Sequence, residues 1–152
     1  MSYSITSQVT EIKMVYQNRI KAANRPQIRN SEDAYKILAE HWSEQIGLIE
    51  EFVILLLDRS NRVLGRQLIS IGGISGTVVD PKILFACALK CRASSVILSH
   101  NHPSGNLHPS KADIALTNKL KQGGNILDIA ILDHLILSPE GGFFSFADEG
   151  LM

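Results

Sequence analysis

The sequence predicts an α/β fold, more closely an α+β sandwich in which a mixed central β-sheet is flanked by helices. Two observations indicate this class: apolar, β-compatible runs alternate with segments of helical periodicity, and the two runs within residues 50–70 lie close enough to pair locally. Local pairing argues against a purely parallel, doubly wound sheet. With 152 residues and 45% hydrophobic content, the chain can bury one core, so we expect one domain with an appendage.

The first half of the chain is predicted to hold an extension, a helix and a hairpin. Residues 1–29 form the extension, with an N-terminal strand in VTEIKMVY and a basic connector that ends near Pro26. A helix follows, capped by Asn30 and running to about Ser43. In EEFVILLLDRSNRVLGRQLIS, residues 50–70, two apolar runs flank a group of turn formers, which is typical of a hairpin.

The second half alternates helices and strands. Glycines and serines in residues 71–76 end the second strand of the hairpin, and Asp80 followed by Pro81 starts a helix through KILFACALKC that should be well buried. SSVILS (94–99) is a short strand, and the next helix runs from Ser110 to about Gln122. Gly123 and Gly124 should close that helix. Two strands are predicted in ILDIAILDHLILS, and a turn with one more short strand in the tail.

Composition limits the functional classes. Fifteen basic residues balance fifteen acidic ones, so no global field draws the chain to nucleic acid or to an anionic membrane. No apolar run approaches the roughly 20 residues that span a bilayer, and the N-terminus lacks the apolar region of a signal peptide. We therefore expect a cytoplasmic protein with no membrane partner. Cys87 and Cys91, four residues apart in a helical pattern, indicate buried thiols in a reducing compartment.

The loop SHNHPSGNLHPSKAD, residues 99–113, contains a candidate zinc site. In an extended backbone, His100 and His102 point to the same side, and Asp113 in the first turn of the next helix can point back at them. Two histidines and one carboxylate, with a water in the fourth position, are a usual ligand set for one catalytic Zn²⁺ per chain. Ser110 and Asp113 also fit a plain capping box, and the two residues alone favour that alternative.

The joint pattern H-x-H-x7-S-x2-D, with the run HNHPSG, resembles the JAMM metal motif of JAB/MPN-domain proteins of the RadC type. Further stretches match in order: EEFVILLLDRSNRVL, SGTVVDPKILFACALKC, SSVILSHNHPSG, PSKADIALTNKLK, ILDHLILS and SFADEGL. The resemblance covers about residues 30–152 and implies a metalloprotease domain there, with the cytidine-deaminase-like MPN/JAB fold. Longer RadC proteins also carry an upstream helix-hairpin-helix segment, and because residues 1–49 contain none, we expect a short form.

The resemblance also implies residue roles. His100, His102 and Asp113 would hold zinc, and Ser110 would orient the water or the developing oxyanion. An upstream glutamate would be the general base, and the family's acid two residues before the phenylalanine of the strand points to Glu50. Glu51 is the alternative, and since strand residues alternate, only one of the two can face the site. Either could instead be a solvated acid at the start of a strand.

Two functions follow from these observations. The resemblance implies a JAMM-type zinc metallohydrolase, a peptidase that cleaves peptide or isopeptide bonds of a peptide or protein substrate with a water that zinc binds and Glu50 activates. The alternative is an accessory protein of DNA repair or of a mobile element, which binds DNA or a replication factor and uses zinc structurally. Its sequence support is a basic cluster that could equally be a solvated connector, namely Arg19, Lys21, Arg25 and Arg29.

Other histidines are expected to lie outside the ligand set. His108 lies within the loop, but the motif does not use it and it should face solvent; His41 has no partner at a suitable spacing. Asp133 and His134 also match the family pattern. They could support the site from outside the ligand set or form a buried hydrogen-bonded couple, and we favour the couple.

Overall fold

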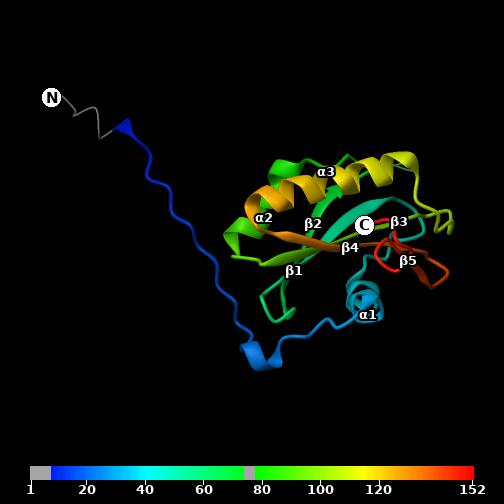
Figure 1. The fold of residues 1–152 in the computed structure, drawn as a ribbon, viewed down its shortest axis with the longest axis horizontal. Helices are drawn as coiled ribbons and strands as arrows, with labels where there is room; N and C mark the ends of the chain where they lie inside the picture. Colours follow the sequence, from blue (N-terminus) through cyan, green and yellow to red (C-terminus); the bar gives the residue numbers. More distant parts are fainter. Residues whose placement is uncertain (1–7, 74–77) are drawn as a thin grey trace.

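The computed structural model describes residues 8–73 and 78–152. In these ranges a five-stranded mixed sheet lies between helices (Figure 1), which confirms the predicted α+β sandwich. The strand order is β2-β1-β3-β4-β5; β3 and β4 are parallel, and the other neighbours are antiparallel. The strands are β1 (Glu51–Leu57), β2 (Val63–Ile71), β3 (Ser95–Asn101), β4 (Ala130–Leu137) and β5 (Phe143–Ser145).

Helices cover both faces of the sheet. The helices α2 (Pro81–Lys90) and α3 (Lys111–Leu127) lie on one face, and α1 (Ser31–His41) lies on the other (Figure 1). A short 3-10 helix, η2 (Ala22–Asn24), precedes α1. No helix within the described ranges combines the length and the apolar character that crossing a membrane requires.

Strand β1 contributes side chains to the hydrophobic cores on both faces of the sheet. All seven of its residues are buried, so its apolar run is continuous, as expected of a strand that is covered on both sides. Phe52, Ile54 and Leu56 pack under α2 and α3. Val53, Leu55 and Leu57 pack toward α1. The helix α2 is less buried than predicted, because Ile83 and Leu89 on its outer side are 51% and 47% exposed.

Local signals start the helices where the sequence predicts. The Asn30 side chain accepts a hydrogen bond from the Asp33 amide at 2.9 Å, and the Asp80 side chain accepts one from the Lys82 amide at 2.9 Å. Helix α1 ends at His41, two residues before the predicted Ser43. The predicted hairpin is present as the antiparallel pair of β1 and β2, and the tail forms the short strand β5.

The predicted N-terminal strand in VTEIKMVY is wrong. Residues 9–16 form no strand, and their large apolar side chains are exposed, with Ile12 at 87%. The segment runs away from the sheet (Figure 1), and its Tyr16 hydroxyl donates to the carbonyl of Leu64 at 3.1 Å. Residues of high β-propensity form a strand only where a neighbouring strand pairs with them. The chain joins the folded body further on, at the bridge between Gln27 and Arg62.

The prediction that α3 closes at Gly123 and Gly124 is also wrong. The helix continues to Leu127, and Asp128 ends it in the left-handed conformation with φ of 55°. The extra turn takes up the beginning of residues 126–138, where two strands were predicted. One strand, β4, is therefore formed in that stretch.

The two glycines of α3 allow close packing. A Cβ on Gly124 would lie 2.3 Å from the carbonyl oxygen of Ile129, which is closer than real carbon atoms approach. A Cβ on Gly123 would lie 2.9 Å from Cε2 of Phe85 in α2. The absence of a side chain therefore lets α3 approach both its neighbour helix and the chain that follows it.

We expect Gly124→Ala to lower the free energy of unfolding by about 1–3 kcal/mol in urea denaturation, because the added methyl group overpacks the contact with Ile129. Helix propensity alone predicts the opposite sign, a gain of about 0.5–1 kcal/mol. Gly65→Ala is the control, since a Cβ there meets nothing within 4 Å. A Gly124→Ala variant as stable as the wild type would contradict this packing.

Candidate metal centre

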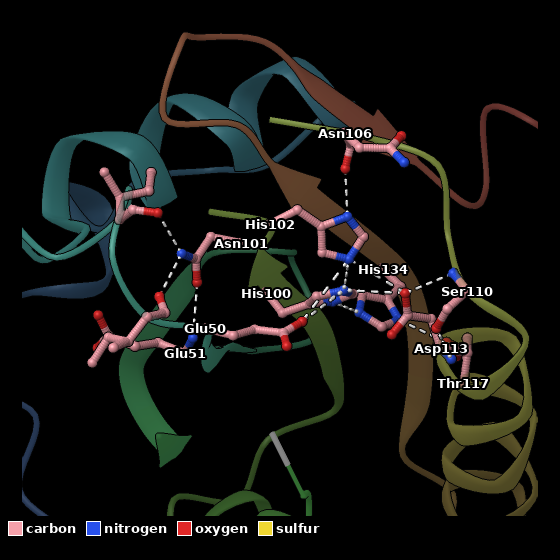
Figure 2. A network of polar contacts seen from close by, with 12 residues as sticks. Glu50, Glu51, His100, Asn101, His102, Asn106, Ser110, Asp113, Thr117 and His134 are labelled. Carbon is pink, nitrogen blue, oxygen red and sulfur yellow. Dashed lines mark hydrogen bonds and ion pairs between the residues drawn. The ribbon is translucent and has the colours of Figure 1, made fainter. Parts of the chain in front are cut away.

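Three elements bring the predicted site residues together at one end of the sheet (Figure 2). His100 lies near the end of β3, and His102 directly follows the strand. Strand β1 is the antiparallel neighbour of β3, with Phe52 opposite His100, so Glu50 at the start of β1 lies beside the histidines. The loop after β3 leads into α3, whose first turn carries Asp113.

Four donor atoms converge there. The Nε2 atoms of His100 and His102 are 3.0 Å apart, and Oδ2 of Asp113 is 3.4 Å from each of them. Oε1 of Glu50 is 3.7 Å from Nε2 of His100 and 3.9 Å from that of His102. One donor atom from each residue lies within 4.8 Å of the others, so the cluster could hold a metal ion.

Hydrogen bonding orients the lone pair of His102 into this cluster. Its Nδ1 contacts the carbonyl oxygen of Asn106, which can only accept, so Nδ1 carries the proton of the neutral ring. The Nε2 lone pair of His102 then faces Nε2 of His100. A lone pair beside a carboxylate attracts a proton or a cation. The contact with Asp113 accordingly raises the pKa of His102, although burial opposes the shift.

Asp113 takes part in the capping box of α3 and also faces the two histidines. Its Oδ2 accepts the backbone N–H of Ser110 at 2.8 Å, and Oγ of Ser110 accepts the backbone N–H of Asp113 at 3.0 Å. The same Oδ2 lies 3.4 Å from both imidazoles. Burial favours a higher pKa for Asp113, but the electrostatic interactions with the His100 and His102 imidazoles outweigh it and hold this pKa well below its usual range. The carboxylate is therefore charged at neutral pH.

Glu50 and Glu51 point to opposite sides of β1, as strand alternation predicts (Figure 2). Glu50 faces the histidines, and burial raises its pKa even though His100 and His102 act against the shift. The carboxylate of Glu51 accepts a hydrogen bond from the hydroxyl of Ser43 on the other side. Of the two candidates for the general base, Glu50 is the one placed at the cluster.

Asn101, between the two histidines, anchors the segment that carries Glu50. Its side chain is fully buried, and its Oδ1 accepts the backbone N–H of Glu51 at 2.8 Å. Its Nδ2 donates to the carbonyls of Ile46 and Ile49 at 2.7 and 2.9 Å. Since strand residues alternate, the amide points away from the imidazoles and toward this segment. Asn101, the residue between the two histidines of the motif, thus ties the end of β3 to the start of β1.

The side chains of Asp133 and His134 point to opposite sides of β4 and form no side-chain couple, although the backbone N–H of His134 donates to Oδ1 of Asp133 at 2.7 Å. The Asp133 carboxylate accepts hydrogen bonds from the Ser145 hydroxyl at 2.6 Å and from the Ala147 amide at 3.0 Å, and burial raises its pKa. The side chain of His134 is fully buried on the other side, with Nε2 2.7 Å from Nδ1 of His100. Burial lowers the pKa of His134 well below its ordinary value.

A cavity of about 840 Å³ opens in front of the cluster. Its walls include Phe52, Val78, Pro103 and Leu116, so apolar surface surrounds the polar centre. His108 also lines it, with an exposed side chain that is not among the four converging donors.

Sequence reasoning overlooked two polar residues that contact the cluster's ligands or their segments. The predicted site gives Asn101 no role, although its place between two inward-facing histidines requires it to point the other way. The predicted site also omits Thr117, although this residue lies four positions after Asp113 and therefore on the same face of the helix. Cys87 and Cys91 are both free thiols; Cys91 is buried as predicted, whereas Cys87 is only partly buried.

The fold and the convergent donors define an α/β domain with a candidate metal centre at the end of the sheet. A family model described as RadC-like JAB domain matches residues 28–151. The chain belongs to this family, as the sequence resemblance implied.

Curated relatives are named UPF0758 protein, a name that states no activity. The protein of Flavobacterium johnsoniae is 46% identical over 124 residues, which are 82% of this chain and 53% of the relative. The protein of Methanosarcina mazei is 40% identical over 82% of this chain and 53% of its own length. The protein of Aquifex aeolicus is 38% identical over 85% and 54%. The chain spans about half the length of the curated relatives it matches.

We expect Asn101→Ala to lower the free energy of unfolding by about 1–3 kcal/mol or more, because it leaves a buried N–H and two carbonyls unpaired. Urea denaturation measures the effect. Asn125→Ala, on the exposed side of α3, is the control and should change stability by less than about 0.5 kcal/mol. Equal stability of the two variants would show that Asn101 does not anchor the segment.

Proposed function

We propose that this chain is a zinc-dependent hydrolase of amide bonds, of the JAMM metallopeptidase type. The observation that carries the proposal is the convergence of His100, His102 and Asp113, with Glu50 beside them, at the floor of an open cavity. Two imidazoles and one carboxylate leave a fourth tetrahedral position free, which is typical of catalytic zinc sites rather than structural ones. Bound there, zinc would polarise the substrate carbonyl and lower the pKa of a water molecule.

Glu50 is the general base of the proposed reaction. Its carboxylate reaches the cluster from the side opposite to α3, and its raised pKa suits a group that takes up and returns a proton. Glu50 accepts the proton of the attacking water as the new C–O bond forms. It then passes that proton to the leaving nitrogen as the C–N bond breaks, so that an amide and water give a carboxylic acid and an amine.

Ser110 is proposed to stabilise the developing oxyanion. Its oxygen accepts the backbone N–H of Asp113, so its own hydroxyl proton remains available to a substrate in the cavity that it lines. The capping bond holds this hydroxyl at the start of α3. One residue would thus position both Asp113 and the carbonyl under attack.

The substrate class is an amide in an extended chain, peptide or isopeptide. The cavity is open, and its lining combines apolar side chains such as Phe52 and Leu116 with polar ones such as Asn106, so it offers both apolar contacts and hydrogen bonds to a polypeptide segment. One residue of the basic cluster that would support the DNA-binding alternative is used in contacts within the chain. Arg25 forms an ion pair with Asp58 at 3.6 Å and donates to the carbonyl of Ile20, so it is engaged within the chain.

The first test is zinc content after dialysis, measured by elemental analysis. We expect about one zinc per chain in the wild type and little in Asp113→Ala. Asp113→Asn separates ligation from folding, because the amide oxygen can still accept the Ser110 N–H while the charge is lost. Glu149→Ala, at an exposed position, is the control. A wild type that takes up no zinc would overturn the proposal.

The second test is turnover of a peptide library, followed by mass spectrometry. We expect Glu50→Gln to bind zinc normally and to lose activity by about 10²–10⁴-fold, since the amide cannot accept the proton of water. Glu51→Gln is the matched control, because the same chemical change on the opposite side of β1 should leave turnover near wild type. Full activity of Glu50→Gln would exclude it as the base.

A further inference from the structure

A third histidine lies behind the candidate metal centre. His134 on β4 is fully buried, and its Nε2 is 2.7 Å from Nδ1 of His100. Its Nδ1 is 2.6 Å from Oγ1 of Thr117 on α3. Both ring nitrogens of His134 are thus used in hydrogen bonds, one to a proposed metal ligand and one to a hydroxyl (Figure 2).

The direction of these hydrogen bonds follows from the single proton of Thr117. Its hydroxyl donates to the backbone carbonyl of Asp113 at 2.8 Å, so the same oxygen must accept from Nδ1 of His134. His134 then carries its proton on Nδ1, and its Nε2 is an acceptor. That acceptor requires His100 to carry a proton on Nδ1.

The surroundings of His134 keep its ring neutral. Phe146 stacks on it with ring centroids 4.6 Å apart, and Phe52 meets it edge to face at 5.5 Å. A charged imidazolium would lose its hydration between these rings, so the ring holds one proton. Because that proton is on Nδ1, Nε2 of His134 has none and can only accept the hydrogen bond from Nδ1 of His100.

We infer that His134 and Thr117 are positioning residues, which hold His100 in the tautomer whose Nε2 lone pair faces His102 and Asp113. The inference rests on the proposed function, since it assigns these two residues to the same metal site. A chain of hydrogen bonds runs from the backbone of Asp113 through Thr117 and His134 to His100. This chain therefore connects the orientation of His100, one proposed ligand, to the first turn of α3, which carries Asp113, another proposed ligand.

The two proposed histidine ligands are held differently. A backbone carbonyl, that of Asn106, orients His102 directly at the exposed side of the loop. His100 lies inside the sheet, 2% exposed, and the hydrogen-bond partner of its Nδ1 is a side chain, that of His134 on β4. Partners of this kind typically change metal affinity by 10–100-fold when they are removed.

The test measures zinc affinity by competition with a chromophoric chelator. Thr117→Val keeps the shape of the side chain and removes the acceptor for Nδ1 of His134, so we expect zinc to bind about 10–100-fold more weakly. Thr117→Ser keeps the hydroxyl and should restore affinity close to wild type. Circular dichroism and urea denaturation establish that each variant is folded.

A second pair of variants addresses the other end of the chain. His134→Gln can still accept from Nδ1 of His100 through its amide oxygen, whereas His134→Leu cannot. We expect His134→Leu to bind zinc about 10–100-fold more weakly than the wild type and His134→Gln to retain most of the affinity. Folded Thr117→Val and His134→Leu proteins with wild-type affinity would overturn the inference and leave both residues with a packing role.

The tautomers themselves are measured by long-range ¹H–¹⁵N correlation NMR on metal-free protein at neutral pH. We expect both His100 and His134 to carry their proton on Nδ1, and Thr117→Val to disturb this state. A proton on Nε2 of His134 in the wild type would overturn the inference. If the wild type bound no zinc, the proposed function would fail, and this NMR result would still decide whether the chain of hydrogen bonds sets the His100 tautomer.

Discussion

The antiparallel register between β1 and β3 is the constraint on which the rest of the site depends. It sets Phe52 opposite His100 and so brings Glu50 beside the two imidazoles. A slip of one residue would move Glu50 by ~3.3 Å and would turn every buried side chain of β1 to the other face of the sheet. Because β1 is buried on both faces, the packing that stabilises the core also fixes the geometry of the candidate centre.

Several side chains of the site stabilise the fold as well. Asp113 caps α3 with the same carboxylate that faces the histidines, and Asn101 ties β3 to the segment before β1. Variants at these positions therefore change stability and metal binding together. Replacements that keep one contact while removing the other, such as Asp113→Asn, are needed to separate the two effects.

Much of the candidate site follows from short-range rules. Alternation along a strand places His100 and His102 on one side, and the same rule separates Glu50 from Glu51. The contacts of His134 and Thr117 do not follow from such rules, because β3 and β4 are joined through a helix and their register is set by packing across the sheet. The predicted couple of Asp133 and His134 conflicts with alternation itself, because adjacent residues of a strand point to opposite faces of the sheet.

Periodicity and contacts within a few positions are enough to establish the fold class, the caps at Asn30 and Asp80, and the hairpin. The residues around the candidate metal centre came from the family resemblance, because Glu50 and the histidines lie far apart along the chain and meet through the register of β1 and β3. The end of α3 depends on tertiary packing. Gly124 does not terminate the helix; it is needed because the backbone carbonyl of Ile129 leaves no space for a side chain there. The tertiary structure also decided that residues 9–16 form no strand, because a strand needs a hydrogen-bonded neighbour. The contact of His100 with His134 on β4 is likewise a tertiary one, because the two residues are far apart along the chain and no local pattern predicts that they meet.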